Sequence, residues 1–345
     1  MSTVFDFGTH SFRTLCRAGS RVVARQMRPI YQCVPDQPAW REVLDKLDVS
    51  WSCGTDTLVV SGDDVDQVCD LVPQPVGNMI PNGSLADGDP ASRQLIASVV
   101  ESLLPAAVNN EVCAVILPIG VTANGNADQS FLTQLVRLRG YSVTTIHAGH
   151  AVVLAAGDSS GFTGVGVSIG AAGTSVSLVR QGVELAHCLV PVGGDWVDEQ
   201  LALAESLRIW DAQGNCFLDC DTIQAWKESL ETSICEPDPQ CDRSRMLKTQ
   251  YEEMLNRIFA SAGRMFADVV NPAFVTGGYP VYCAGGATCV PGFERLVTRN
   301  VLTDHGFDIT VTDVKVIEDD GYCVARGGLI HAEIEAEVCE RRRAA

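Results

Sequence analysis

Two short segments combine small and polar residues in a pattern that suits phosphate binding. The first, Asp6-Phe-Gly-Thr-His-Ser-Phe-Arg13, stands where one strand is expected to turn back into the next. Glycine lets backbone amides approach a phosphate closely. Asp6 is a candidate ligand for a hydrated Mg²⁺, and Arg13 is placed to pair with phosphate oxygens. Taken alone, the segment is better explained by a hairpin turn with a surface arginine.

The second segment, Ser168-Ile-Gly-Ala-Ala-Gly-Thr174, repeats this arrangement at a later turn between strands. A third, Ala284-Gly-Gly-Ala-Thr-Cys-Val-Pro-Gly292, follows an expected strand and opens a helix. Glycine there allows a flat ring or a phosphate to approach the start of the helix. Each signal is weak alone, because tight strand connections use the same residues.

The elements that must position these segments alternate between strand and helix, which predicts an α/β fold. A meander over 3–25 is followed by helices and by a buried strand at 112–118; a second meander over 164–190 is followed by a helix over 198–207. This repeat predicts two similar lobes that face each other across a cleft. The two turns would then clamp a polyphosphate from both sides. We expect residues 1–150 to form lobe I, completed by a C-terminal helix at 322–345. Residues 151–321 would form lobe II, with 196–270 as a peripheral helical subdomain.

The composition of the chain excludes some classes of function. The chain has 345 residues, and its 25 Lys and Arg against 43 Asp and Glu give a net charge of −18. A negative field of this size repels phosphate backbones and anionic lipid, so nucleic-acid binding is not expected. The 14 cysteines are scattered, often in apolar runs, which favours free thiols in a reducing cytosol. No signal core and no apolar run of membrane-spanning length is present, so we expect a cytoplasmic protein.

The order and spacing of the motifs resemble the actin superfamily, and bacterial actin homologues of the MreB type in particular. The first two segments resemble its phosphate loops, and 285–292 resembles its adenosine loop. The stretches 180–187, 192–198 and 323–328 and the pair Lys227-Glu228 also fall where the family has counterparts. The resemblance spans nearly the whole chain. It implies two lobes of ribonuclease-H type, ATP or ADP with Mg²⁺ in the cleft, and ATP-dependent self-association into filaments.

The resemblance also implies which residues bind the nucleotide, with Asp6 as the metal residue. They are Asp6, Gly8, Thr9, His10, Ser11, Arg13, Gly170, Ala171, Ala172, Gly173, Thr174, Gly193, Gly194, Asp195, Lys227, Glu228, Gly285, Gly286, Ala287 and Val290.

Three departures from the family concern hydrolysis. Ser168 stands where the second loop usually begins with Asp, and Ala171 and Ala172 stand where that loop usually has Gly or Asp. Counting back along the interlobe helix, the position of the water-positioning Gln or Glu falls on Ala148. Alanine neither orients nor deprotonates water. His147 and His150 flank it as candidate substitutes, although a histidine there more often caps or packs. Hydrolysis is therefore expected to be slow, metal-independent or absent.

Other interpretations stay open at this level. A nucleotide-gated adaptor of the same superfamily, like the FtsA or PilM proteins, is the main alternative, and a small-molecule kinase is a weaker one. Direct membrane binding is doubtful, because the chain begins almost directly at its first strand and is strongly acidic. The thiols of Cys216, Cys220, Cys235 and Cys241 lack the spacing of common zinc sites, so packing or surface thiols are expected.

Overall fold

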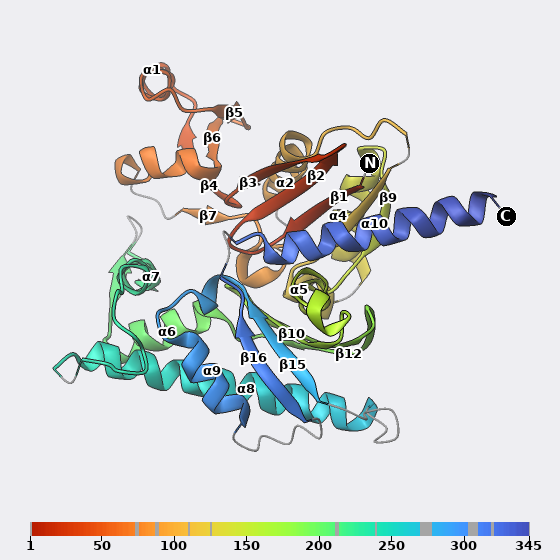
Figure 1. Ribbon diagram of the computed structural model, residues 1–345. Helices are drawn as coiled ribbons and strands as arrows, with labels where there is room; N and C mark the ends of the chain where they lie inside the picture. Colours follow the sequence, from red (N-terminus) through yellow and green to blue (C-terminus); the bar gives the residue numbers. More distant parts are fainter. Residues whose placement is uncertain are drawn as a thin grey trace.

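Two five-stranded sheets with the same topology form the centres of the two halves of the computed structural model (Figure 1). The first sheet runs in spatial order through β3 (Arg21–Met27), β2 (Phe12–Ala18), β1 (Ser2–Phe7), β8 (Val112–Ile116) and β9 (Ser142–Thr145). The second runs through β12 (Val183–Val190), β11 (Thr174–Arg180), β10 (Gly164–Ile169), β15 (Tyr279–Ala284) and β16 (Val311–Val316). Each sheet joins an antiparallel meander to two parallel strands. The repeat confirms the predicted α/β fold with two similar lobes.

The structure describes most of the chain. Residues 270 and 345, which end two of the expected ranges, lie outside the described part. The described ranges are 2–72, 76–86, 90–109, 111–124, 126–210, 214–238, 240–269, 278–302, 310–318 and 321–344.

Strand β1 is buried on both faces, so its alternate residues serve two cores. Phe5 and Phe7 pack with α2 (Pro90–Leu103) and α4 (Asn126–Leu138). Val4 faces the other side and packs with α5 (Ala148–Ala156) and α10 (Cys323–Ala344). The first sheet is thereby covered on both sides.

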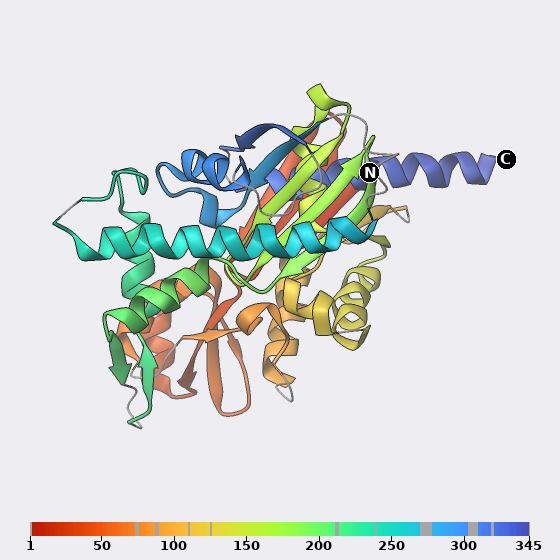
Figure 2. The same cartoon turned by 90° about the horizontal axis from the view of Figure 1, so that it is seen from below.

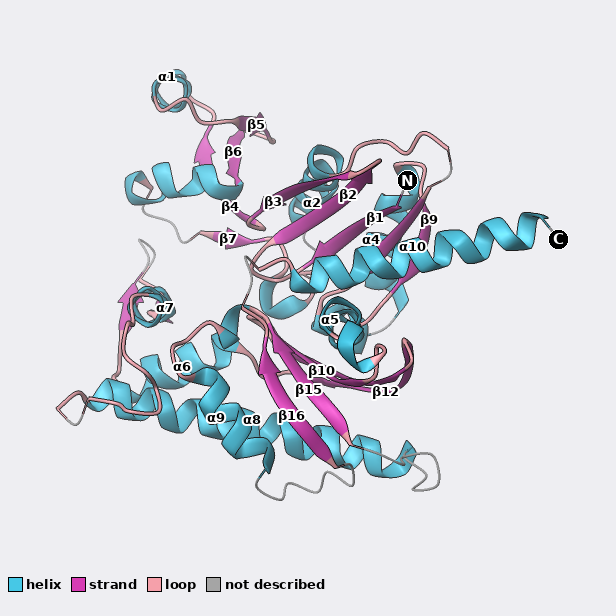
Figure 3. Ribbon diagram, viewed as in Figure 1, coloured by secondary structure: helices cyan, strands magenta, loops and turns pink. Residues whose placement is uncertain are grey.

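Helices α5 and α10 lie between the two sheets (Figure 3). A Cβ atom at Gly166 of β10 would collide with the backbone oxygen of Gly149 in α5, and one at Gly327 of α10 would collide with that of Ala151. Both close approaches therefore require glycine. They fix α5 against the second sheet on one side and against α10 on the other. In this way α5 positions its first residues at the boundary of the two halves.

The second sheet is covered on its outer face by α8 (Asp242–Val269), which runs across it (Figure 2). The buried residues of α8 recur at helical spacing, as the sequence predicts; they include Leu247, Tyr251, Met254, Leu255, Ile258, Phe259, Ala262 and Phe266. Helices α6 (Gly194–Ala204), α7 (Cys220–Glu228) and α9 (Phe293–Leu302) complete this layer. None of the described helices is both long and apolar enough to cross a membrane.

Smaller elements surround the two sheets. A four-stranded sheet of β5 (Trp51–Cys53), β6 (Thr57–Ser61), β4 (Ile30–Pro35) and β7 (Gly77–Asn78) packs with α1 (Pro38–Lys46) around its own core. Helix α3 (Ile119–Asn124) and the hairpin of β13 (Arg208–Trp210) and β14 (Cys216–Leu218) are also present. The 3-10 helices are η1 (Gly62–Gln67), η2 (Cys69–Leu71), η3 (Pro81–Gly83), η4 (Asp158–Ser160) and η5 (Gly286–Thr288).

Candidate functional site

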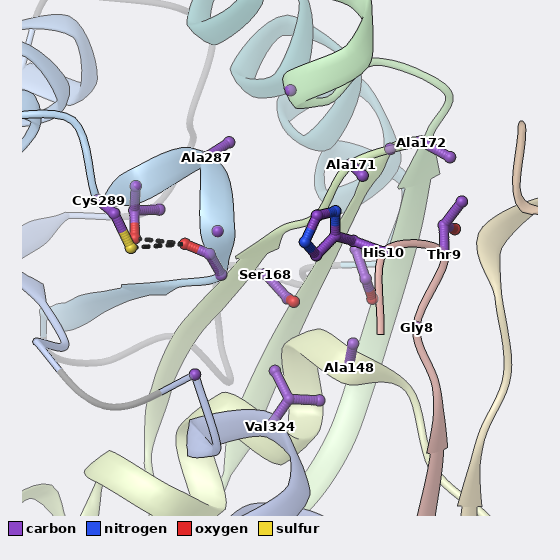
Figure 4. Close-up of a pocket in the computed structure, with 18 of the residues that line it drawn as sticks. Gly8, Thr9, His10, Ala148, Ser168, Ala171, Ala172, Ala287, Cys289 and Val324 are labelled. Atoms are coloured by element: carbon purple, nitrogen blue, oxygen red, sulfur yellow. Dashed lines mark hydrogen bonds between the residues drawn. The ribbon is translucent and has the colours of Figure 1, made fainter. Parts of the chain in front are cut away.

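One large cavity collects loops from both sheets. Its volume is about 1120 Å³, and its lining includes both strand turns that the sequence singles out. Figure 4 shows His10 near the middle of the labelled residues, with Ala287 and Cys289 on one side and Ala148 on another. The nucleotide candidates that line the cavity are Asp6, Gly8, Thr9, His10, Ser11, Arg13, Gly170, Ala171, Ala172, Gly173, Gly194, Asp195, Lys227, Glu228, Gly285, Gly286, Ala287 and Val290.

The first loop connects β1 to β2. Their antiparallel register places Asp6 opposite Arg13, and burial raises the pKa of Asp6 to about 6 although Arg13 opposes this shift. A Cβ atom at Gly8 would lie 2.7 Å from the backbone oxygen of Ser11, so only glycine fits the turn. Among the described residues, the buried Nε of Arg13 has no hydrogen-bond partner. A buried guanidinium nitrogen of this kind suits an anionic ligand.

The second loop connects β10 to β11 and also holds the start of α6. The amide of Gly194 donates to the oxygen of Gly170 at 2.9 Å, and the amide of Asp195 donates to that of Ala171 at 3.0 Å. A Cβ atom at Gly193 would lie 2.7 Å from the nitrogen of Gly173. Glycine is therefore required at Gly193, the residue before α6, because the loop and the helix start touch. Two of the first amides of α6 are thereby occupied by the loop.

The third loop follows β15. Gly285 has φ +113°, and a Cβ atom there would collide with the backbone oxygen of Ile169, so the loop lies directly on the end of β10. Gly286 instead faces open space, with nothing within 4 Å of a Cβ atom. The hydroxyl of Tyr251 in α8 donates to the oxygen of Ala287 at 3.1 Å and anchors the loop. The third loop therefore presents Gly286, without a side chain, to the cavity. The loop itself is anchored to β10 and α8.

A buried ion pair lies at the cavity wall between α6 and α7. Lys227 Nζ lies 2.7 Å from both carboxylate oxygens of Asp198. Glu228 does not pair with Lys227 and instead accepts from Gln224 at 2.8 Å. The sequence reasoning missed Asp198. The signal that was available is its spacing of three residues from Asp195, which places both on one face of a helix.

The lining of the cavity carries more acidic than basic side chains. Three basic residues, Arg13, Lys227 and Arg295, line it. Six acidic residues line it as well: Asp6, Asp195, Asp198, Glu228, Glu294 and Glu318. A polyphosphate would meet repulsion here unless a cation accompanied it. The donor set therefore fits a phosphate ligand that arrives together with a divalent cation.

The positions expected to govern hydrolysis also lie at the cavity. Ser168, on β10, and Ala148, at the start of α5, both line it, as does His147. The Nδ1 atom of His147 lies 2.8 Å from the Oε2 atom of Glu184, which is a residue of β12. His150 points elsewhere: it is buried and its Nε2 contacts the oxygen of Gly182 at 3.0 Å. Of the two candidate histidines, His147 alone therefore belongs to the lining.

Two further candidates support the cavity without lining it. Thr174 is fully buried, and its hydroxyl donates to the oxygen of Val192 at 2.7 Å. Gly193 backs the second loop, as described above. Both act on the shape of the loop instead of facing a ligand.

Among the described residues, the four cysteines of the 216–241 stretch are not grouped as possible metal ligands. All fourteen cysteines are free thiols. In the described part of the chain, the one group of metal-ligating side chains is His147, Glu184 and His187. Cys235 donates to the oxygen of Gly292, and Cys216 is exposed.

Two sheets of one topology, with the loops of both around one cavity, are the arrangement of the actin-like fold. The likeness to MreB-type homologues is confirmed at the level of the fold. By its sequence, the chain belongs to the volactin family, whose model matches residues 1–332.

Solved structures of the same fold include a MamK double helical filament, with 17% identity, a TM-score of 0.70, and coverage of 96% of this chain and 99% of that one. MreB 5 of Spiroplasma citri bound to AMPPNP has 14% identity and a TM-score of 0.67, with 99% and 98% of the two chains covered. MreB5 of the same organism bound to ADP has a TM-score of 0.66 at 14% identity, with 98% of each chain covered. No curated protein matches the sequence.

Proposed function

We propose that this protein binds ATP or ADP together with Mg²⁺ in the cavity and polymerises into filaments, with slow or altered hydrolysis. The observation that carries the proposal is the convergence of three loops, from two sheets of one topology, on a single cavity of about 1120 Å³. Structures of this fold include a filament of MamK and complexes of MreB5 with ADP and with AMPPNP.

The residues present suit a nucleotide. The unpartnered Nε of Arg13 gives a phosphate a buried donor among the described residues. Gly286 leaves open space above the third loop, which a flat ring can fill. His10 lies on the exposed side of the first loop, at the centre of the cavity (Figure 4). Together these features favour phosphates near the first two loops and a base near the third.

Asp6 is the proposed metal residue. Its carboxylate lies in the cavity and is 7% exposed, so ionising it without a nearby cation is unfavourable. Magnesium accepts one or two carboxylates and keeps several waters, which one aspartate beside a polyphosphate satisfies. When bound, Mg²⁺ would neutralise phosphate charge. The same lining argues for a metal-bound nucleotide over a free one.

Slow hydrolysis follows from the uncharged side chains at the key positions. Ser168 supplies a hydroxyl where actin homologues of the MreB type usually have a carboxylate. Ala148 supplies no polar side-chain atom. Positioning and general-base groups typically contribute about 10²–10⁴-fold in rate. His147 is the candidate substitute that faces the cavity, but it is engaged with Glu184.

For self-association we propose head-to-tail contacts, which propagate instead of closing into a ring. The net charge of −18 argues against nucleic acid as a partner. The lobe boundaries at 150/151 and 321/322 also stay a proposal, supported by the packing of α10 on β1 and β8.

The test is high-speed pelleting with negative-stain microscopy, run with ATP, ADP, AMPPNP and no nucleotide, each with and without Mg²⁺, while phosphate release is followed. We expect nucleotide-dependent filaments that release phosphate slowly. Arg13→Gln should lose nucleotide binding, whereas Arg28→Gln, a surface arginine of similar chemistry, should retain it. Nucleotide binding without a pellet under any condition would favour the nucleotide-gated adaptor, and no nucleotide binding would overturn the proposal.

A further inference from the structure

A compact group of side chains that could ligate a metal lies beside the proposed nucleotide cavity, where His147, the residue before α5, contacts strand β12. Glu184 Oε2 lies 2.8 Å from His147 Nδ1 and 3.7 Å from His187 Nδ1. One ligand atom from each of the three residues lies within 4.8 Å of the others. The two imidazole rings stack with their centroids 3.8 Å apart. No feature of the proposed nucleotide site requires Glu184 or His187.

An irregularity in the sheet creates this group. Glu184 and His187 are three residues apart, so a regular strand would place them on opposite faces. In the pairing of β11 with β12, however, Leu178 pairs with Ala186 while the next residue, Val179, pairs with Glu184. The extra residue on β12 is Leu185, and this bulge turns Glu184 and His187 to the same face. Bulges of this kind commonly re-aim side chains next to functional sites.

The donor set has a clear chemical preference. Two imidazole nitrogens and one carboxylate oxygen suit Zn²⁺ and neighbouring divalent transition ions, and not Mg²⁺ or Ca²⁺, which prefer oxygen ligands alone. The hydroxyl of Ser177 donates to Glu184 Oε1 at 2.6 Å, so the other oxygen of the carboxylate stays available. Supporting hydrogen bonds of this kind orient metal ligands. The site is also accessible, since the side chains of His147, Glu184 and His187 are 29%, 19% and 44% exposed.

We propose that His147, Glu184 and His187 bind one divalent transition-metal ion of the Zn²⁺ class, with an open coordination position toward solvent. The metal would join the start of α5, which carries Ala148 at the nucleotide cavity, to the edge strand of the second sheet. It would also hold His147 toward Glu184. This site is separate from the proposed Mg²⁺ position at Asp6 and does not depend on nucleotide binding.

The test is titration of the full-length, chelator-treated protein with Zn²⁺ and with Co²⁺ in the absence of nucleotide. Excess Mg²⁺ is kept present to occupy sites made only of oxygen ligands. We expect one tight site per chain, a rise in melting temperature on Zn²⁺ addition, and visible Co²⁺ absorption without sulfur-to-metal charge-transfer bands. The last point separates this site from the cysteine thiols.

Two ligand variants and two comparison variants make the test specific. His187→Gln and Glu184→Gln should each weaken binding by about 100-fold or more, and Ser177→Ala by about 10-fold. His331→Gln removes a nearby imidazole that is not one of the three ligands and should bind metal as the wild type does. Circular dichroism identifies any variant that does not fold; His187 is half-exposed, so its variant is expected to fold. The proposal is overturned if wild-type protein shows no stoichiometric site, if both ligand variants bind normally, or if the Co²⁺ spectrum shows thiolate ligands.

Discussion

Lys227 Nζ donates to both carboxylate oxygens of Asp198 at 2.7 Å, and the two side chains are only 9% and 5% exposed. This pair joins α6 to α7 at the wall of the cavity. Because Asp198 already neutralises it, Lys227 is less available to a phosphate than its place in the lining suggests. We therefore expect the pair to stabilise the contact of α6 with α7, and a buried charge is left behind if one partner is removed.

Replacing Lys227 with methionine should lower the free energy of unfolding by about 3–5 kcal/mol, because Asp198 would stay buried without its partner. The double variant Lys227→Met/Asp198→Leu should recover much of this loss. Lys46→Met is the matched control, since Lys46 pairs with Glu42 on the surface and should change stability by less than about 1 kcal/mol. Urea denaturation measures all three. A double variant as unstable as Lys227→Met would contradict the argument.

Two adjacent glycines of the third loop should respond in opposite ways. Gly285→Ala should destabilise the fold by at least about 2 kcal/mol, because φ is +113° and the new Cβ atom would meet the backbone of Ile169. Gly286→Ala adds its methyl group to open space in the cavity, so stability should change by no more than about 0.5 kcal/mol. Its nucleotide affinity should nevertheless fall. Thermal unfolding and nucleotide titration separate the two effects, and equal stability of the two variants would refute this assignment.

Local sequence patterns predicted the two meanders and the three loops. Alternation of strand and helix signals, buried apolar runs and glycine turns all depend on residues that are close together in the sequence. Contacts between distant segments were not predictable in this way. The partner of Asp198 lies on a different helix. The grouping of Glu184 with His187 depends on a β-bulge that the residue pattern does not predict. The start of α6 at Gly194 was also missed: the expected helix began at residue 198. The glycine pair at 193 and 194 is typical of a turn, but Gly193 instead allows the close contact with the second loop.

Restoring a polar side chain at the start of α5 should accelerate hydrolysis. Ala148→Gln is expected to raise the rate of phosphate release by about 10²-fold, because glutamine can orient a water toward the cavity that Ala148 lines. Ala156→Gln, at the other end of the same helix, should leave the rate unchanged. Phosphate release under single-turnover conditions measures both. An unchanged rate in Ala148→Gln would mean that water positioning at this place does not limit the reaction.

The contact of α5 with α10 should weaken in acid. Burial lowers the pKa of both His150 and His331, whose rings lie 6.0 Å apart. Thr144, Glu184 and Glu335 also lie near His331. The unfolded chain, with the ordinary histidine pKa of 6.5, therefore binds protons that the folded chain does not. The stability that these two neutral histidines contribute is fully present above pH 6.5. It is lost progressively as the pH falls below that value.

His331→Gln should consequently show a shallower loss of stability between about pH 7 and pH 5 than the wild type. Denaturant unfolding at several pH values measures the difference between the two proteins, so the opposite contribution of Asp6, whose pKa is raised, cancels. Parallel curves for both proteins would show that His331 does not contribute.

Filament assembly should increase with salt. Copies that each carry a net charge of −18 repel one another, and screening shortens the range of this repulsion from about 10 Å at 0.1 M salt to about 3 Å at 1 M. Pelleting over a series of KCl concentrations measures the effect, with sucrose as a control for excluded solvent. Filaments that dissolve as KCl rises would show instead that ion pairs between copies dominate the contacts.

The packing of α10 has a consequence for the order of events during synthesis. Ala325, Leu329 and Ala332 of this last helix cover Val4 and Leu15 of the first two strands. The first sheet leaves the ribosome early, yet the part of its face that α10 covers stays exposed until almost the whole chain has emerged. The second sheet and its helices α6, α8 and α9 come from a continuous stretch that is finished sooner. We expect the core that Val4 shares with α5 and α10 to be completed last, which makes the side of β1 that faces α10 the surface that a chaperone would protect.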